Sequence, residues 1–329
     1  MQYKSARGFT GWAQLGILFG FLGVGLILAG AIQLYFGYKA LGANSLPLSK
    51  VADAMLEALM KPENAVYMQL SQIFGTFFLL FIPSVAFIIV CHKKFSWAGF
   101  NAHFNLLQIG LAFLIILATT PFATPFADIS KSVLAHFPAI DKLAQGAEET
   151  YNKAVMAMSG LKTWPQFFTG VFIIAFLPAL FEELAFRGVL QNLLVKWIKK
   201  PIVAIVITSL VFSLVHASYY LFISRFILGL SLGLLFYRSK NIWVNTFAHF
   251  MNNLMALTQL FFLNKTKGAK IDVNDMDMKM PIWSLFITLT ILIGLFIVFE
   301  KLSSKNRQAI EAKEAAEVPY SDNPFTNYA

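Results

Sequence analysis

The sequence is poor in cysteine and in charged residues. Of its 329 residues only one is a cysteine, Cys91, and 13% are charged. Zinc ribbons, iron–sulfur clusters and disulfide scaffolds need several thiols, so a single cysteine excludes all three classes. Soluble globular domains carry about 25% charged residues, so the low charge content also argues against an ordinary soluble protein.

The chain is instead rich in apolar residues. They make up 57% of the chain, which contains 34 Phe, and the mean hydropathy is +0.65. The net charge of +9 is not gathered into a basic cluster with interleaved aromatic residues, so we expect no nucleic-acid partner. An excess of Lys and Arg is typical of the cytoplasmic loops of membrane proteins. Composition therefore indicates an integral membrane protein, with the lipid bilayer as its first partner.

Eight apolar stretches are candidates for membrane spans, since about 20 mostly apolar residues cross the hydrocarbon core. They are Trp12–Tyr35, Ile73–Val90, Leu106–Phe122, Phe167–Ile198, Ile202–Ala217, Leu221–Tyr237, Ile242–Leu263 and Ile282–Phe299. They are too long and too uniformly apolar for the tilted strands of a barrel. We predict an all-α fold, a polytopic transmembrane helical bundle of about eight spans.

The loops between these stretches predict an orientation. Lys4 and Arg7 before the first apolar run would also suit a secretory signal, but the run is longer than an ordinary signal core, which favours an uncleaved first span. Basic residues gather in every second loop, whereas the loops 38–70, 123–164 and 264–281 are nearly balanced. The positive-inside rule then places both termini in the cytoplasm, and we expect a bacterial cytoplasmic membrane.

Five regions follow from this pattern. Residues 1–128 hold the N-terminal transmembrane helices, and 129–164 form an extramembrane segment in which 129–158 have apolar residues at helical spacing. That segment is either a surface helix or a lid over a site. Residues 165–263 form a helical core, 264–300 a loop and the last span, and 301–329 a disordered cytoplasmic tail.

Ionisable residues interrupt the fourth apolar stretch, where each is expensive to bury and therefore suggests a function. Glu183 and Arg187 stand four residues apart, so they share a helical face and can form an ion pair. Glu182 lies about 100° around the helix from Glu183 and need not share that partner. The pattern suggests one neutralised carboxylate and one that is free to do chemistry.

Two further apolar stretches carry polar groups. His216 ends one of them, and His249 and Asn253 stand four apart in another. Each alone is more often a helix–helix hydrogen bonder than a catalyst, just as Glu183 and Arg187 alone would be a structural pair. Glu182, His216, His249 and Asn253 occur on three apolar helices, however, and we expect them to meet in one wet cavity.

These residues match a known family in order and spacing. Glu182-Glu183-x-x-x-Arg187, then Phe212-x-x-x-His216, then His249-x-x-x-Asn253 resembles the CPBP family, which includes type II CAAX prenyl endopeptidases and bacteriocin-processing or immunity-type membrane proteases. Gly229-x-x-x-Gly233 before the last motif also matches. The resemblance covers roughly residues 165–263.

The resemblance implies an intramembrane endopeptidase that cleaves membrane-associated peptides or proteins. By motif, Glu182 and His216 activate water, His249 and Asn253 stabilise the oxyanion, and Glu183 with Arg187 support the helix. Such hydrolysis needs an activated water, a stabilised oxyanion and a proton for the leaving amine.

Two alternatives stay open. Glu182, His216 and His249 are the ligand types of a zinc hydrolase, so a divalent metal such as zinc would be an alternative to a metal-free glutamate mechanism, which we favour because no HExxH motif is present. The same polar groups would also suit a transporter or a non-catalytic immunity or scaffold protein.

Overall fold

The computed structural model describes residues 3–42, 47–103, 106–158, 161–267 and 280–316. Within these ranges the regular structure is helical, apart from an isolated antiparallel bridge between Lys4 and Thr10. The predicted all-α fold is confirmed.

The helices are named here in chain order. They are α1 Gly11–Leu41, α2 Leu48–Leu59, α3 Ala65–Thr76, α4 Ile82–Cys91, α5 Leu106–Leu134, α6 Pro138–Met158, α7 Trp164–Gly170, α8 Leu177–Glu183, α9 Asn192–Ile198, α10 Pro201–Val215, α11 Phe222–Ser239, α12 Ile242–Lys267 and α13 Ser284–Ala316. Short 3₁₀ turns occupy Pro62–Asn64 (η1) and Phe95–Ala98 (η3), and π-helical turns occupy Phe77–Phe81 (η2), Val171–Phe176 (η4) and Leu184–Gln191 (η5).

Among the described residues, six continuous helical stretches are long and apolar enough to cross a membrane. They are Gly11–Leu41, Pro62–Cys91, Leu106–Leu134, Trp164–Ile198, Phe222–Ser239 and Ser284–Lys313. The other two predicted spans are helices as well, but α10 has only 15 residues and α12 carries several polar side chains. The prediction of about eight spans therefore agrees roughly with the structure.

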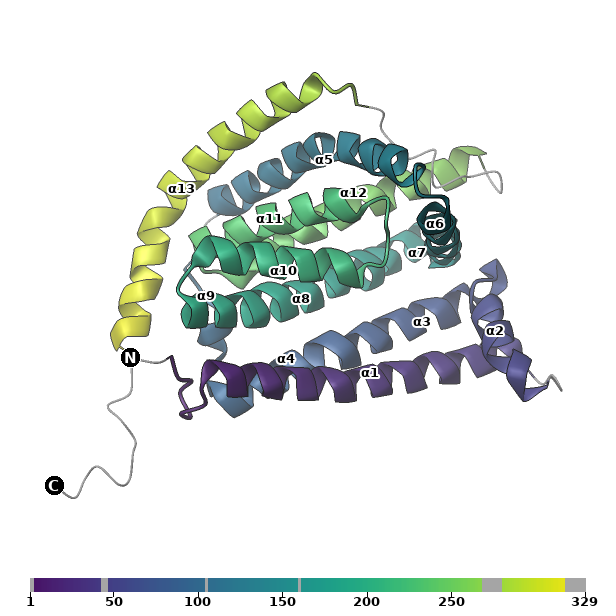
Figure 1. Cartoon of the computed structure of the whole chain (residues 1–329), viewed down its shortest axis with the longest axis horizontal. Coiled ribbons are helices and arrows are strands. Elements are labelled where there is room, and N and C mark those ends of the chain that lie inside the picture. Colours follow the sequence, from purple (N-terminus) through teal and green to yellow (C-terminus); the bar gives the residue numbers. More distant parts are fainter. Residues whose placement is uncertain (1–2, 43–46, 104–105, 159–160, 268–279, 317–329) are drawn as a thin grey trace.

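The helices that carry the candidate residues lie near the middle of the bundle (Figure 1). Helices α1, α3 and α4 lie along one side, α5 and α13 along the other, and α8 to α12 lie between them. One buried apolar cluster joins α1 and α4 to the helix of Glu182, and another joins α5 and α13 to α11 and α12. Apolar packing from both sides thus fixes the central helices.

The central stretch Trp164–Ile198 contains the motif Glu182-Glu183 between two π-helical turns, η4 and η5. It begins with a capping box, in which the Thr163 hydroxyl accepts from the Gln166 amide and the Gln166 side chain accepts in return. π-helical turns inside α-helices widen the backbone and are frequent at functional sites. Here they flank the two carboxylates on either side.

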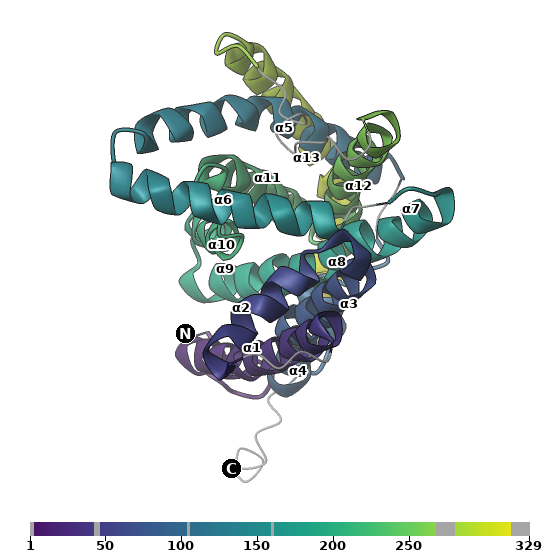
Figure 2. The same ribbon diagram turned by 90° about the vertical axis from the view of Figure 1, so that its right-hand side faces the viewer.

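Helix α6 lies across one end of the bundle rather than along it. Figure 2 shows it running over the ends of α10 and α11, and it also contacts α3 and α5. The predicted segment from residue 129 begins within α5, which continues to Leu134. The hydroxyls of Ser130 and Ser132 bond to the carbonyls of Phe126 and Asp128 one turn earlier, so these polar residues fit the helix without ending it.

The predicted disordered tail from residue 301 is wrong over its first part, since α13 extends to Ala316. Its polar end packs against the bundle. Ser303 is fully buried and accepts from the Gln108 side chain at 2.9 Å, and Arg307 forms a two-pronged ion pair with Glu300. Residues 317–329, the remainder of the predicted tail, lie outside the described residues.

Candidate active site

Three helices bring Glu182, His216 and His249 together. The Glu182 Oε2 atom lies 3.8 Å from Nε2 of His216, the residue that caps α10, and 3.8 Å from Nε2 of His249 on α12. The imidazole of His249 is 5% exposed and the carboxylate of Glu182 is 17% exposed, so the pair is largely shielded from the exterior. The expected meeting of these three side chains therefore occurs.

Hydrogen bonds on the far side of each ring orient both imidazoles. His216 donates from Nδ1 to the Phe212 carbonyl at 2.7 Å, and His249 Nδ1 lies 2.9 Å from Oε1 of Glu183. A carbonyl or a carboxylate can only accept, so each Nδ1 carries the ring hydrogen. In the neutral ring Nε2 then presents a lone pair, and both lone pairs face Glu182.

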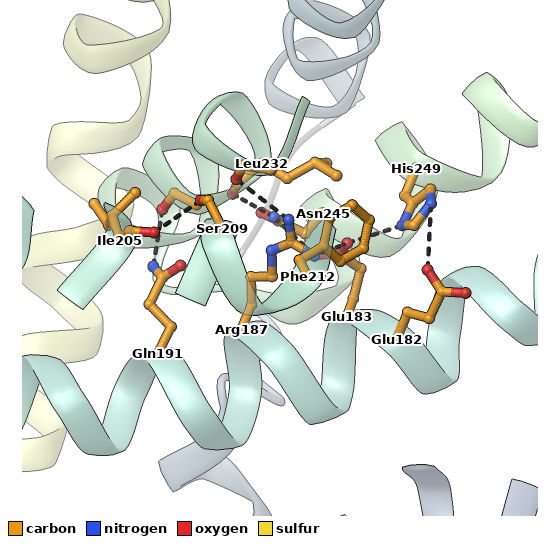
Figure 3. Close-up of polar contacts among 12 residues, drawn as sticks. Glu182, Glu183, Arg187, Gln191, Ile205, Ser209, Phe212, Leu232, Asn245 and His249 are labelled. Atoms are coloured by element: carbon orange, nitrogen blue, oxygen red, sulfur yellow. Dashed lines mark hydrogen bonds and ion pairs between the residues drawn. The ribbon is translucent and has the colours of Figure 1, made fainter. Parts of the chain in front are cut away.

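Glu183 is the centre of a fully buried polar network, shown in Figure 3. Its Oε1 atom accepts from Nη1 of Arg187 at 2.9 Å, which is the ion pair that the four-residue spacing predicts. Its Oε2 atom accepts from the amide of Asn245 at 3.1 Å. Since the same carboxylate also holds His249, it links the buried arginine to the imidazole that faces Glu182.

Arg187 has partners beyond Glu183. Its Nη2 atom donates to the Gly229 carbonyl at 3.2 Å, and its guanidinium lies 4.5 Å from the centre of the Phe212 ring. A Cβ on Gly229 would lie 3.0 Å from the Cβ of Ser209, so the glycine permits α11 to approach α10 closely. The Gly229-x-x-x-Gly233 motif thus provides both close helix packing and an accessible carbonyl.

Asn253 is placed differently from the other three candidates. Its amide nitrogen lies 3.4 Å from the Ala175 carbonyl, and its oxygen accepts from Asn252 at 3.5 Å. It is thus one turn beyond His249, against the helix that precedes Glu182. The structure does not bring its amide into contact with the Glu182 carboxylate.

Sequence reasoning missed Asn245 and Gln191. Asn245 is fully buried and donates to both Glu183 and the Leu232 carbonyl, at 3.1 and 2.6 Å. Gln191 donates to the Gly233 carbonyl at 2.9 Å. A signal was available, because Asn245 precedes His249 by four residues and Gln191 follows Arg187 by four, which extends each motif by one turn along the same helical face.

A groove of about 930 Å³ leads to the carboxylate from between α1, α3 and the central helices. Its walls are mostly apolar, for example Leu18 and Leu22 of α1, with Glu182 and His216 at one side. The Glu182 Oε2 atom is buried and has no hydrogen-bond partner among the described residues. The apolar groove therefore leads to a buried carboxylate oxygen that has no hydrogen-bond partner among the described residues.

The metal alternative names Glu182, His216 and His249 as ligands. Among the described residues, no three or more His, Cys, Asp and Glu side chains are arranged to hold a metal ion. The Glu182 Oε2 atom nevertheless lies 3.8 Å from both imidazole nitrogens, which brings together the three side chains that the metal alternative names.

Comparison with known proteins bears on this same part of the chain. Residues 164–255 match the family described as type II CAAX prenyl endopeptidase, Rce1-like. This part of the chain, called the Rce1-like domain, is similar to that family. The resemblance to the CPBP family is confirmed over this domain, which contains every candidate site residue. No curated protein and no solved structure gives a significant match to the chain.

The Rce1-like domain resembles type II CAAX prenyl endopeptidases over residues 164–255 of the chain. Together with six helices of spanning length and apolarity, it makes the chain an integral membrane protein. The match spans α7 to the middle of α12, and so includes all three helices that meet at Glu182.

Proposed function

We propose that this protein is an intramembrane endopeptidase in which Glu182 is the general base. The observation that carries the proposal is the position of one buried carboxylate oxygen 3.8 Å from two imidazole nitrogens, each oriented from its far side. A water molecule with hydrogen bonds of about 2.8 Å can bridge polar atoms at this spacing from one side. Such a water would be oriented by the imidazoles and deprotonated by Glu182.

The proposed hydrolysis needs only water and side chains of the Rce1-like domain. Water oxygen attacks the scissile carbonyl carbon while Glu182 accepts a water proton, and the carbonyl oxygen becomes the tetrahedral oxyanion. The C–N bond then breaks, and the leaving nitrogen takes the proton that Glu182 received. Glu182 thus acts first as the base and then as the acid.

His249 would stabilise the oxyanion by donating from Nε2. A neutral ring whose hydrogen is on Nδ1 cannot donate from Nε2, so this role requires a second ring proton. The Glu183 carboxylate at Nδ1 would then face an imidazolium and balance its charge. Asn253 would be a second donor, for which its amide must leave the weak 3.4 Å contact with the Ala175 carbonyl.

The groove supports a membrane-associated substrate. Its apolar walls between α1, α3 and the central helices suit a hydrophobic segment, and Glu182 stands where such a segment would meet polar groups. We expect purified protein in liposomes to cleave a reporter peptide that carries an apolar membrane anchor. The same peptide without its anchor should be cleaved at least about a hundredfold more slowly, since burial of an anchor contributes several kcal/mol to binding.

Mass spectrometry of the products measures both rates and locates the cleaved bond. A Glu182→Gln sample serves as the blank for contaminating proteases. Equal cleavage by the variant would contradict the proposed enzyme, whereas equal cleavage of anchored and unanchored peptides would contradict only the role of the groove.

We also propose that catalysis proceeds without a metal. Because Glu182 is needed as the base and a carboxylate bound to a metal could not fill that role, cleavage of the anchored peptide should persist after exhaustive chelation. Elemental analysis of the purified protein should find less than about one tenth of an equivalent of zinc. Loss of activity on chelation, with recovery when zinc alone is added back, would reverse this assignment in favour of a metal hydrolase.

We further propose the orientation that the basic loops indicate. Lys196 in α9 and Lys199 just after it lie at the end of the bundle opposite α6 (Figure 1). By the positive-inside rule that end faces the cytoplasm of a bacterial membrane, with both chain termini on the same side. Helix α6 would then cover the opposite face.

A further inference from the structure

The short connection that carries His216 is tied to α6 through Arg225. Arg225, in the first turn of α11, donates from Nη1 to the backbone carbonyl of His216 at 3.0 Å. Its guanidinium carbon also lies 4.9 Å from the centre of the Tyr151 ring on α6. One side chain therefore contacts both the backbone of a catalytic candidate and the helix that lies across the bundle.

Two more contacts attach α6 to the same connection. The Tyr220 hydroxyl donates to Oδ1 of Asp141 at 2.6 Å, and the Ser218 hydroxyl donates to Oε2 of Glu148 at 2.9 Å. Burial and the hydrogen bond to Asp141 raise the pKa of Tyr220 to about 12. The phenol therefore keeps its proton, and this hydrogen bond its donor, throughout the neutral range.

A second, open cavity lies between α6 and the same histidine. Its volume is about 960 Å³, and its lining includes Leu143, Ala147 and Tyr151 from α6 together with His216 and Ala217. His216 lines this cavity and the apolar groove alike, so the imidazole stands between them. Movement of α6 would open the site from the side opposite the groove.

The backbone after His216 is held in an uncommon conformation. Ala217 has a φ of 50°, in the left-handed region that residues other than glycine rarely occupy. Such a conformation costs of order 1 kcal/mol or more and persists only where its surroundings hold it. The bond from Arg225 to the His216 carbonyl precedes this residue, and the contacts of Ser218 and Tyr220 with α6 follow it.

We propose that α6 is a lid over the active site and that Arg225 is a positioning residue that transmits the seating of α6 to His216. The kinetic part of this proposal rests on the proposed peptidase function. When α6 packs against the bundle, Tyr151 stacks on Arg225. Arg225 then fixes the His216 carbonyl, and this directs the imidazole toward Glu182. Lifted, α6 releases this restraint and opens the second cavity.

Kinetics on the anchored peptide test the positioning role. Arg225→Ala should lower kcat by about tenfold or more, as small misplacements of a reacting group do, with KM changed by less than about twofold. Arg225→Lys keeps the charge but not the planar guanidinium group that stacks on Tyr151. Its kcat should therefore lie between that of wild type and that of Arg225→Ala. Tyr151→Phe keeps the ring and should match wild type, whereas Tyr151→Leu should lower kcat.

Coupling between the two residues distinguishes positioning from general damage. Because Tyr151 is proposed to act through Arg225, the double variant Tyr151→Leu, Arg225→Ala should be no slower than Arg225→Ala alone. Arg238→Ala is the matched control, since Arg238 is at the other end of α11 and pairs with Glu300. It should leave kcat unchanged. Additive effects of the two substitutions, or a wild-type kcat in Arg225→Ala, would overturn the positioning role.

A labelling experiment tests the lid without using activity. Ala144 of α6 is 1% exposed, so Ala144→Cys in a Cys91→Ala background should react slowly with a water-soluble maleimide while α6 is seated. Asp141→Ala or Arg225→Ala should increase the rate by about tenfold, since protection reports local opening. An unchanged rate overturns the lid. If wild type cleaves no peptide but labelling responds as expected, the peptidase function fails and the lid stands.

Discussion

Replacing Glu182 with Gln should abolish detectable cleavage of the anchored peptide. The substitution keeps the size of the side chain but removes its ability to accept a proton from water. General bases typically contribute about 10²- to 10⁴-fold to the rate, so kcat should fall by that amount. Substrate binding should be nearly unchanged, because the loss occurs in the transition state. Initial rates measured by mass spectrometry of both products would show it.

Two comparisons make this result specific. Glu63→Gln removes one charge at an exposed position of η1 and should leave the rate unchanged. Glu182→Asp retracts the carboxylate by one methylene and should retain a small fraction of the activity, since a base must stay within hydrogen-bond reach of the water. Full activity in Glu182→Gln would place the base elsewhere.

Two results with the wild-type protein would favour the alternative functions. A protein that binds the anchored peptide but never cleaves it would behave as the scaffold or immunity protein that the same polar residues allow. Uptake of a solute into proteoliposomes without peptide cleavage would indicate the transporter instead, since buried carboxylates and imidazoles also serve transport.

Hydropathy predicted the helices well, because the bilayer requires long apolar segments and leaves the backbone no other way to satisfy its hydrogen bonds. All eight predicted stretches are helical. Helix ends were less predictable. The polar end of α13 is stabilised by Gln108, nearly two hundred residues away, and local sequence cannot show such a partner.

The spacing of residues along a single helix predicted part of the site. Four-residue spacing predicts the ion pair between Glu183 and Arg187 and leaves Glu182 free of it, and both features are present. The bond from His249 to Glu183 joins residues 66 positions apart, so only the packing of α12 against α8 could show it. For the same reason the sequence did not show that the Asn253 amide contacts Ala175.

Replacing Arg187 with Met should have the largest effect on stability. Both Arg187 and Glu183 are fully buried, so the substitution leaves a carboxylate in an apolar interior without its cation. Breaking a buried ion pair from one side typically costs about 3–5 kcal/mol, because the remaining charge is desolvated and unpaired. The substitution also removes the bond to the Gly229 carbonyl and the contact with Phe212. Unfolding in detergent micelles with increasing denaturant would measure the loss.

Neutralising the partner should recover part of that loss. In the double variant Glu183→Gln, Arg187→Met no buried charge lacks a partner, and the Gln oxygen can still accept from Asn245 or His249. We therefore expect the double variant to be more stable than Arg187→Met alone. Arg238→Met is the control, because Arg238 is 41% exposed and its pair with Glu300 should contribute at most about 1 kcal/mol. If Arg187→Met were no less stable than Arg238→Met, the buried pair would not anchor the helix of Glu182, and His249 would owe its orientation to other contacts.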